Sequence, residues 1–210
     1  MNFPVDYPIA LDPIHRRAKT QQSLSAKSSA APIGTPIFLD DGAMLRLRAI
    51  EKDDVDALIR AFKRMTPEQV RARVFHALSE LPVPVARAMC RVDPDDGLAL
   101  VATDPDGGEI RGEARVHFDP VTESAELAIA VDPNFTGRGL GRILVENLIS
   151  ASRRLGIQEV WGDTQAGNTA MIALVDRLGF EHRRGRDDAS LVRFSLELGK
   201  QAPDESAPKR

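Results

Sequence analysis

Apolar positions follow two spacings between residues 43 and 198, and each spacing predicts one kind of element. Alternation of side chains predicts strands at residues 44–49 and 109–118, and we also expect strands at residues 98–103, 124–131, 157–163 and 190–198. Apolar residues three and four positions apart predict helices, which we expect at residues 53–65, 67–78, 83–92, 139–155 and 168–178. Hairpin-connected strands come first and strands alternating with helices follow. The order predicts an α+β domain in which helices flank a mixed sheet.

The two ends of the chain lack such a pattern. Residues 12–37 are rich in Ser, Ala, Lys and Pro and carry little periodic hydrophobicity. Such a segment does not bury enough apolar surface to offset the entropy lost on ordering. We therefore expect residues 1–42 and 199–210 to be disordered tails of one domain at residues 43–198.

The composition is that of an ordinary globular protein, with 42% hydrophobic and 28% charged residues among 210. The formal net charge of −3 does not favour nucleic-acid binding, and no apolar run approaches the roughly 18 residues of a membrane helix. The N-terminus has no signal-peptide pattern, and Cys90 is the only cysteine, so an internal disulfide is excluded. We expect a cytoplasmic protein with neither a membrane nor a nucleic-acid partner. No metal is expected, because the histidines lack partners at ligand spacing.

A glycine-rich segment joins the strand at 124–131 to the helix at 139–155. Gly137, Gly139 and Gly141 leave the backbone N–H groups accessible at a helix N-terminus, where their partial positive charge suits a pyrophosphate. Arg138 and Arg142 would add charge-assisted contacts. The run has no Gly-Lys-Ser/Thr ending and no third glycine of the dinucleotide fingerprint, so neither nucleotide motif fits. Taken alone, the segment also fits a glycine-rich turn without a ligand.

Two motifs around this segment resemble those of the GNAT superfamily of acyl-CoA-dependent N-acyltransferases. The first motif in that family is V-x-P-x-x-Q/R-x-x-G-x-G/A. It is matched by Val131, Pro133, Gly139 and Gly141, with Thr136 where Gln or Arg is usual. The second is N-x-x-A/M-x-x-L-x-x-x-L-G-F, matched by Asn168, Met171, Leu174, Leu178, Gly179 and Phe180. The resemblance extends over residues 44–198.

The resemblance implies a mostly antiparallel, twisted sheet of six to seven strands and acetyl-CoA as the cosubstrate. The backbone of Ile129, Ala130 and Val131 would hold the pantetheine arm. The pyrophosphate would bind to the loop formed by Thr136, Gly137, Arg138, Gly139, Leu140, Gly141 and Arg142. Asn168 would brace the cofactor region, although an asparagine here also suits the N-cap of a helix.

A closer resemblance is to the acetyltransferase domain of bacterial protein-lysine acetyltransferases of the Pat type. It rests on residues 45–50, on residues 65–75 and on Trp161-Gly162 ahead of the Asn168 motif. In that family the catalytic glutamate follows an alanine at the position of Glu126. Alternation places Glu126 on one face of its strand with Ala128 and Ala130. A solvated glutamate at a strand end is the alternative interpretation.

The acyl transfer needs a neutral amine. A lysine with a pKa of about 10.4 is ~3.4 units from neutrality at pH 7, which costs ~4.6 kcal/mol, and a positioned general base lessens that cost. The tyrosine that protonates the leaving thiolate in many GNAT enzymes is replaced by Val175. Water then protonates a thiolate whose thiol has a pKa of about 8.5. A protein lysine is the expected acceptor by resemblance alone. A small amine and a non-catalytic acyl-CoA-binding regulator stay as alternatives.

Overall fold

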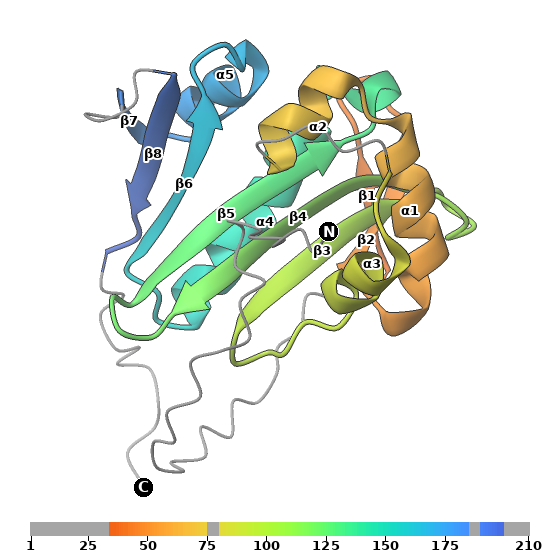
Figure 1. The fold of residues 1–210 in the computed structure, drawn as a ribbon, viewed down its shortest axis with the longest axis horizontal. Helices are drawn as coiled ribbons and strands as arrows, with labels where there is room; N and C mark the ends of the chain where they lie inside the picture. Colours follow the sequence, from red (N-terminus) through yellow and green to blue (C-terminus); the bar gives the residue numbers. More distant parts are fainter. Residues whose placement is uncertain (1–33, 75–79, 185–189, 200–210) are drawn as a thin grey trace, which may run out of the picture.

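A computed structural model describes residues 34–74, 80–184 and 190–199 of the chain (Figure 1). The strands form one sheet in the order β1-β2-β3-β4-β5-β6-β8-β7. The strands are β1 (Thr35–Phe38), β2 (Met44–Ala49), β3 (Gly97–Thr103), β4 (Ile110–Asp119), β5 (Ser124–Val131), β6 (Glu159–Gln165), β7 (Glu181–Arg184) and β8 (Leu191–Glu197). The helices are α1 (Val55–Arg64), α2 (Pro67–Val74), α3 (Val83–Met89), α4 (Leu140–Arg154) and α5 (Thr169–Arg177). Short 3₁₀ helices, η1 (Lys52–Asp54) and η2 (Pro133–Phe135), precede α1 and follow β5.

The mixed, mostly antiparallel sheet is confirmed. Every neighbouring pair of strands is antiparallel except β5 and β6, which run parallel. The described residues hold eight strands, more than the expected six to seven, because β1 and β7 were not foreseen. Each of these has four residues at an edge of the sheet, too few for alternation to stand out from a loop.

Strand β1 also corrects the expected domain boundary. It pairs with β2 over its whole length, from Thr35 opposite Leu47 to Phe38 opposite Met44. The ordered fold therefore includes residues 35–42, which composition had assigned to the N-terminal tail. The expectations for residues 1–33 and 200–210 lie outside the described residues.

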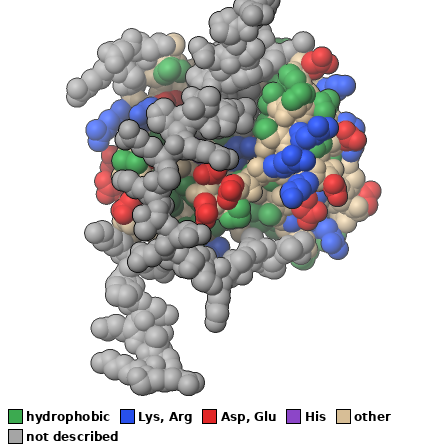
Figure 2. Space-filling view, turned by 60° about the horizontal axis from the view of Figure 1, so that its bottom comes forward, with side chains coloured by type: hydrophobic (Ala, Val, Ile, Leu, Met, Phe, Trp, Pro, Cys, Tyr) green, Lys and Arg blue, Asp and Glu red, His purple; other side chains and the backbone are tan. Residues whose placement is uncertain are grey.

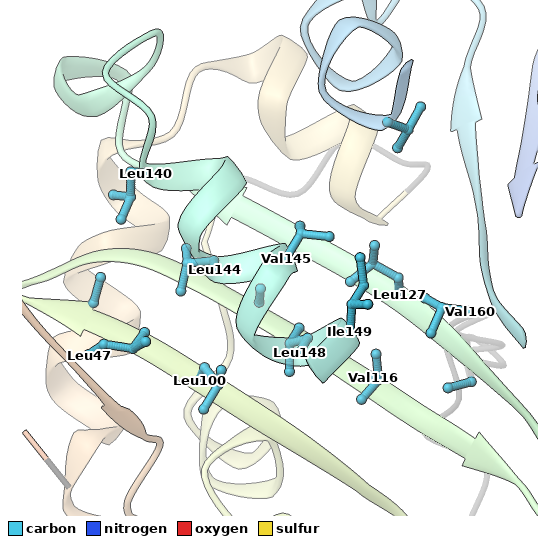
Figure 3. Close-up of a cluster of buried hydrophobic side chains, with 14 of the residues drawn as sticks. Leu47, Leu100, Val116, Leu127, Leu140, Leu144, Val145, Leu148, Ile149 and Val160 are labelled. Atoms are coloured by element: carbon cyan, nitrogen blue, oxygen red, sulfur yellow. The ribbon is translucent and has the colours of Figure 1, made fainter. Parts of the chain in front are cut away.

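Helices cover both faces of the sheet (Figure 1). On one face, α4 places Leu140, Leu144 and Leu148 in a core with side chains of the central strands (Figure 3). Close packing requires Gly112 on β4, because a Cβ there would lie 2.8 Å from Leu144 Cδ1. On the other face, α1, α2 and α3 enclose a second core that contains Phe62.

Strand β5 divides its side chains between these faces, as alternation predicted. Leu127, Ile129 and Val131 pack into the core beneath α4. Glu126 and the two alanines, Ala128 and Ala130, are half-buried on the opposite face.

Candidate functional site

Strands β5 and β6 pair only at their first residues. Their parallel register runs from Ser124 opposite Glu159 to Glu126 opposite Trp161, and the strands then diverge (Figure 1). Gly162 lies where the divergence begins. A Cβ there would lie 2.8 Å from Leu127 O and 2.5 Å from Phe194 Cζ, so only glycine lets these groups approach so closely.

The second half of β5 has no neighbouring strand on the side of this divergence. The N–H of Asp132 donates to the carbonyl of Arg111 at 2.8 Å, one position beyond Gly112 and Val131, the pair that ends the β4–β5 register. In an antiparallel ladder such hydrogen-bonded pairs alternate, so Ala130 also faces β4, whereas Ile129 and Val131 face away from it. Among the three residues expected to hold pantetheine, only Ile129 and Val131 thus point their backbone N–H and C=O groups away from β4, toward the side that has no neighbouring strand. The carbonyl of Val131 accepts a hydrogen bond from Gln69 Nε2 of α2 at 3.0 Å.

The loop between β5 and α4 carries a row of available donors. Gly137 and Gly139 have φ of +72° and +83°, which favour glycine. Within the described residues, no oxygen accepts a hydrogen bond of normal geometry from the backbone N–H of Gly137, Arg138, Gly139, Leu140, Gly141 or Arg142. Six consecutive donors that lead into a 15-residue helix suit an anion with several oxygens.

An ion network around one buried carboxylate braces the base of this loop. The carboxylate of Asp132, only 1% exposed, accepts from Asn134 N–H at 3.0 Å and pairs with Arg64 at 2.7 Å and Arg111 at 3.3 Å. Burial would raise the pKa of Asp132, but the Asn134 N–H and the two guanidinium groups outweigh it and lower the pKa. The ring of Phe135 lies against Arg111 and Arg138, at 5.2 Å and 4.5 Å. The loop conformation is therefore set before any ligand binds.

The two loop arginines already have carboxylate partners. Arg138 pairs with Asp41 at 2.6 Å, and Arg142 lies 3.2 Å from Glu146 and 3.6 Å from Asp40. The Asp40 carboxylate also fills the space beside Gly139, where a Cβ would lie 2.7 Å from Asp40 Oδ1. The turn between β1 and β2 is thus part of the loop's support. Sequence reasoning missed it because residues 40 and 41 fell in the expected tail.

The remaining expected cofactor residues have structural partners. Asn168 caps α5 by accepting from Met171 N–H at 3.2 Å, and its Nδ2 donates to Thr164 Oγ1 at 3.0 Å, which ties the helix to β6. Thr136 Oγ1 donates to the carbonyl of Pro133 at 2.7 Å. The side chain of Leu140 is buried, so Leu140 offers a ligand only its backbone N–H. Val175 is also buried, and its side chain has no hydroxyl.

Glu126 lies at the point where β5 and β6 separate. It is half-buried, opposite His117 of β4 and beside Trp161 of β6, so the three residues share one face of the sheet. Arg193 of β8 lies over the Trp161 ring at 4.4 Å. The sequence indicates Trp161 only through a resemblance and does not indicate Arg193, because their proximity depends on strand order.

Other candidate chemistry is absent from the described part of the chain. Cys90 is buried, which raises the pKa of its thiol to about 11, so it stays protonated at neutral pH. Residues 34–74, 80–184 and 190–199 contain no group of His, Cys, Asp and Glu that could hold a metal ion. None of the helices they form is long and apolar enough to cross a membrane. Basic and acidic side chains are interspersed on the face seen in Figure 2.

Comparisons with known proteins agree with this geometry. The acetyltransferase (GNAT) family matches residues 56–180, more than half of the chain. The chain is 26% identical over 162 residues to acetyltransferase PA5475 of Pseudomonas aeruginosa, covering 76% of this chain and 87% of that protein. It is 47% identical over 86 residues to the ribosomal protein bS18-alanine N-acetyltransferase of Salmonella typhimurium, covering 36% of this chain and 58% of that enzyme.

The fold is similar to a solved structure of the same family. The crystal structure of the GNAT domain of S. lividans PAT has a TM-score of 0.72 and 24% identity, covering 78% of this chain and 96% of that domain. Family, fold and loop geometry therefore lead to one assignment. The chain belongs to the GNAT family of acetyltransferases and is an N-acetyltransferase that uses acetyl-CoA.

Proposed function

We propose that this enzyme acetylates a lysine side chain of a protein in the cytoplasm, with Glu126 as the general base. The observation that supports this most strongly is the arrangement along β5. Six unpaired amides lie beyond its carboxyl end, Ile129 has a free backbone edge, and a carboxylate lies where the strands separate.

The proposed cofactor path follows β5. The pyrophosphate would accept hydrogen bonds from the N–H groups of Gly137–Arg142, and the pantetheine arm would extend along Ile129 and Val131. From Val131 back to Glu126 is five residues, or about 17 Å at roughly 3.3 Å per residue, which suits an extended pantetheine arm. Bound acetyl-CoA supplies the activated acetyl group.

Glu126 would act on the acceptor rather than on the cofactor. Its carboxylate takes a proton from the lysine ammonium, and the neutral amine attacks the thioester carbonyl. The C–N bond forms and the C–S bond breaks, the second amine proton is lost to solvent, and the thiolate takes a proton from water. Water suffices for that last step because a thiol is a moderate acid, with a pKa of about 8.5. Val175 offers no hydroxyl for it.

Replacing Glu126 by Gln tests this assignment. We expect turnover to fall by about 10²–10⁴-fold, the usual contribution of a general base, while calorimetry gives an unchanged Kd for acetyl-CoA. Glu159→Gln is a matched control, because Glu159 is also half-buried and lies on the next strand, opposite Ser124. It should retain full activity. If Glu126→Gln is as active as the control, Glu126 is not the base.

The acceptor is tested with the wild-type protein. Acetyl-CoA and a cell lysate are incubated with the enzyme, and acetylated residues are found by mass spectrometry. New acetyl groups on lysine side chains support the proposal. Exclusive acetylation of N-terminal α-amines, the reaction in the name of the Salmonella typhimurium relative, or turnover of polyamines alone would contradict it. Binding of acetyl-CoA without turnover of any amine would favour a regulator.

A further inference from the structure

Trp161 is a large aromatic residue held in place outside both apolar cores. Among the described residues, neither hydrophobic cluster includes it, although it is the only tryptophan of the chain. It lies on the Glu126 face of the sheet, half-buried, at the separation of β5 and β6. Its role is therefore not explained by packing of the fold.

Two contacts restrict the indole ring. Its Nε1–H donates to Ser124 Oγ of β5 at 3.2 Å, so the ring leans toward β5. From the other side, Arg193 of β8 lies over the ring at 4.4 Å. Asp163 holds that guanidinium with two hydrogen bonds, at 2.9 Å and 2.6 Å. The ring thus stands between Arg193 and the Glu126 strand in one fixed orientation.

The position of Trp161 beside Glu126 brings the indole ring close to an incoming acceptor amine. Glu126 and Trp161 are register partners on adjacent strands, so their Cα atoms are separated by about one strand spacing, roughly 4.8 Å. An amine that reaches the Glu126 carboxylate from the side of β6 brings its carbon chain next to the indole. An apolar ring gains from contact with methylene groups and gains little from a compact polar acceptor.

We propose that Trp161 is a specificity-determining residue, whose ring packs against the aliphatic stem of the acceptor amine and selects a side chain with four methylenes, that of lysine. Arg193 and Asp163 are positioning residues that fix the ring. Because Asp163 pairs with Arg193, the cation beside the ring is balanced and does not drive the incoming ammonium away. This inference rests on the proposed lysine acetylation and adds the residue that recognises the stem.

A series of acceptor peptides tests the contact. Peptides with a blocked N-terminus carry lysine, ornithine or diaminobutyrate, whose stems have four, three and two methylenes. A shorter stem reaches Glu126 less well in every variant. The effect of the indole ring is therefore measured by how much the ratio of kcat/KM for lysine and diaminobutyrate peptides differs between variants. Each methylene that is fully buried against the ring should change kcat/KM roughly fourfold. We expect Trp161→Ala to lower kcat/KM for the lysine peptide about tenfold and to flatten the preference for lysine over diaminobutyrate.

Three measurements keep the outcome clear. The KM for acetyl-CoA should not change in Trp161→Ala, and Trp161→Phe should retain most of the stem preference. Phe38→Ala, which removes a 65% exposed aromatic on β1, should behave as wild type. Since Trp161 is the only tryptophan, its fluorescence in the wild-type protein with CoA should change when the lysine peptide is titrated in and should change less with diaminobutyrate.

The failures are distinguishable. If the wild type acetylates no lysine peptide, the proposed function fails, and this inference fails with it. If the wild type acetylates lysine but Trp161→Ala keeps the same stem preference and peptide binding leaves the fluorescence unchanged, only the role of Trp161 is overturned.

Discussion

The two ends of β5 are built differently. At its carboxyl end, Asp132 is 1% exposed between two arginines, and a second ion pair links Arg138 to Asp41 of a distant turn. At its amino end, Glu126 is half-buried, and the nearby Arg193–Asp163 pair is 59% and 26% exposed. A row of backbone amides binds an anion only if its dihedral angles are fixed, so the proposed cofactor end needs a firm frame. The proposed acceptor end would act through side chains, which need less support from the backbone.

The largest difference should appear in stability. Asp132→Ala removes a buried carboxylate that caps η2 and is shared by two half-buried arginines, each of which keeps a second carboxylate partner. We expect the free energy of unfolding to fall by about 2–4 kcal/mol, from the lost charged hydrogen bonds and the lost cap. Asp163→Ala breaks a more exposed pair at the acceptor end and should cost no more than about 1 kcal/mol. Urea unfolding of both variants makes the comparison. Equal losses would show that the two ends are equally braced.

The next effect concerns the shape of the loop. Gly139→Ala places a Cβ 2.7 Å from Asp40 Oδ1 at a φ of +83°, so it strains the loop backbone and displaces the Asp40 carboxylate, and we expect acetyl-CoA affinity to fall about tenfold. Gly156→Ala is the matched control. It has a similar φ of +81° but no atom within 4 Å of the added carbon. It should lose stability and retain its Kd for acetyl-CoA by calorimetry. A Kd that is unchanged in Gly139→Ala would remove the loop from the cofactor site.

Acid should weaken the cofactor end. The folded pKa of Asp132 lies below its unfolded value, so its contribution to stability is complete above about pH 4 and is lost as the pH falls through the folded pKa. Asp54, whose pKa is also lowered despite burial because Arg48 and a backbone N–H bind it, adds to the same acid limb. Thermal unfolding from pH 7 to pH 3 should therefore show a smaller loss of Tm for Asp132→Ala than for wild type. If Tm falls with pH equally in Asp132→Ala and wild type, the lowered pKa of Asp132 is contradicted.

The smallest effect is expected at Arg138. Because Asp41 already pairs with it, we expect Arg138→Gln to change the Kd for acetyl-CoA by no more than about threefold at 0.15 M salt. A tenfold weakening that disappears at high salt would show that the arginine leaves Asp41 to bind phosphate. The sequence-based expectation of a direct phosphate contact would then hold.

Much of the fold was readable from local pattern. Strands β2 and β5 begin and end where the sequence placed them, and the glycines of the loop mark the two positions with positive φ ahead of α4. The face of β5 that carries Glu126 also followed from alternation. These features depend on neighbours within a few residues, which is the range that periodicity reports.

The supporting contacts were not readable in this way. Asp41 is 97 residues from Arg138, and Arg64 is 68 residues from Asp132, so nothing in their local sequence indicates that they meet. The expected arginine contacts with phosphate rested on the charge of Arg138 and Arg142 alone, and charge does not reveal a carboxylate already in place. Strands of four residues at the sheet edges were missed for the same reason, because their order comes from the strand beside them.

By itself, the sequence determined the element order, the glycine loop at the start of α4, the family motifs and the carboxylate on β5. Only the tertiary structure decided that the β1–β2 turn supports the loop, that β5 and β6 part at Glu126, and that Trp161 stands there between Arg193 and β5. The physical reason is that dihedral preference and periodicity act along the chain, whereas ion pairs and ring contacts depend on which strands become neighbours in the sheet.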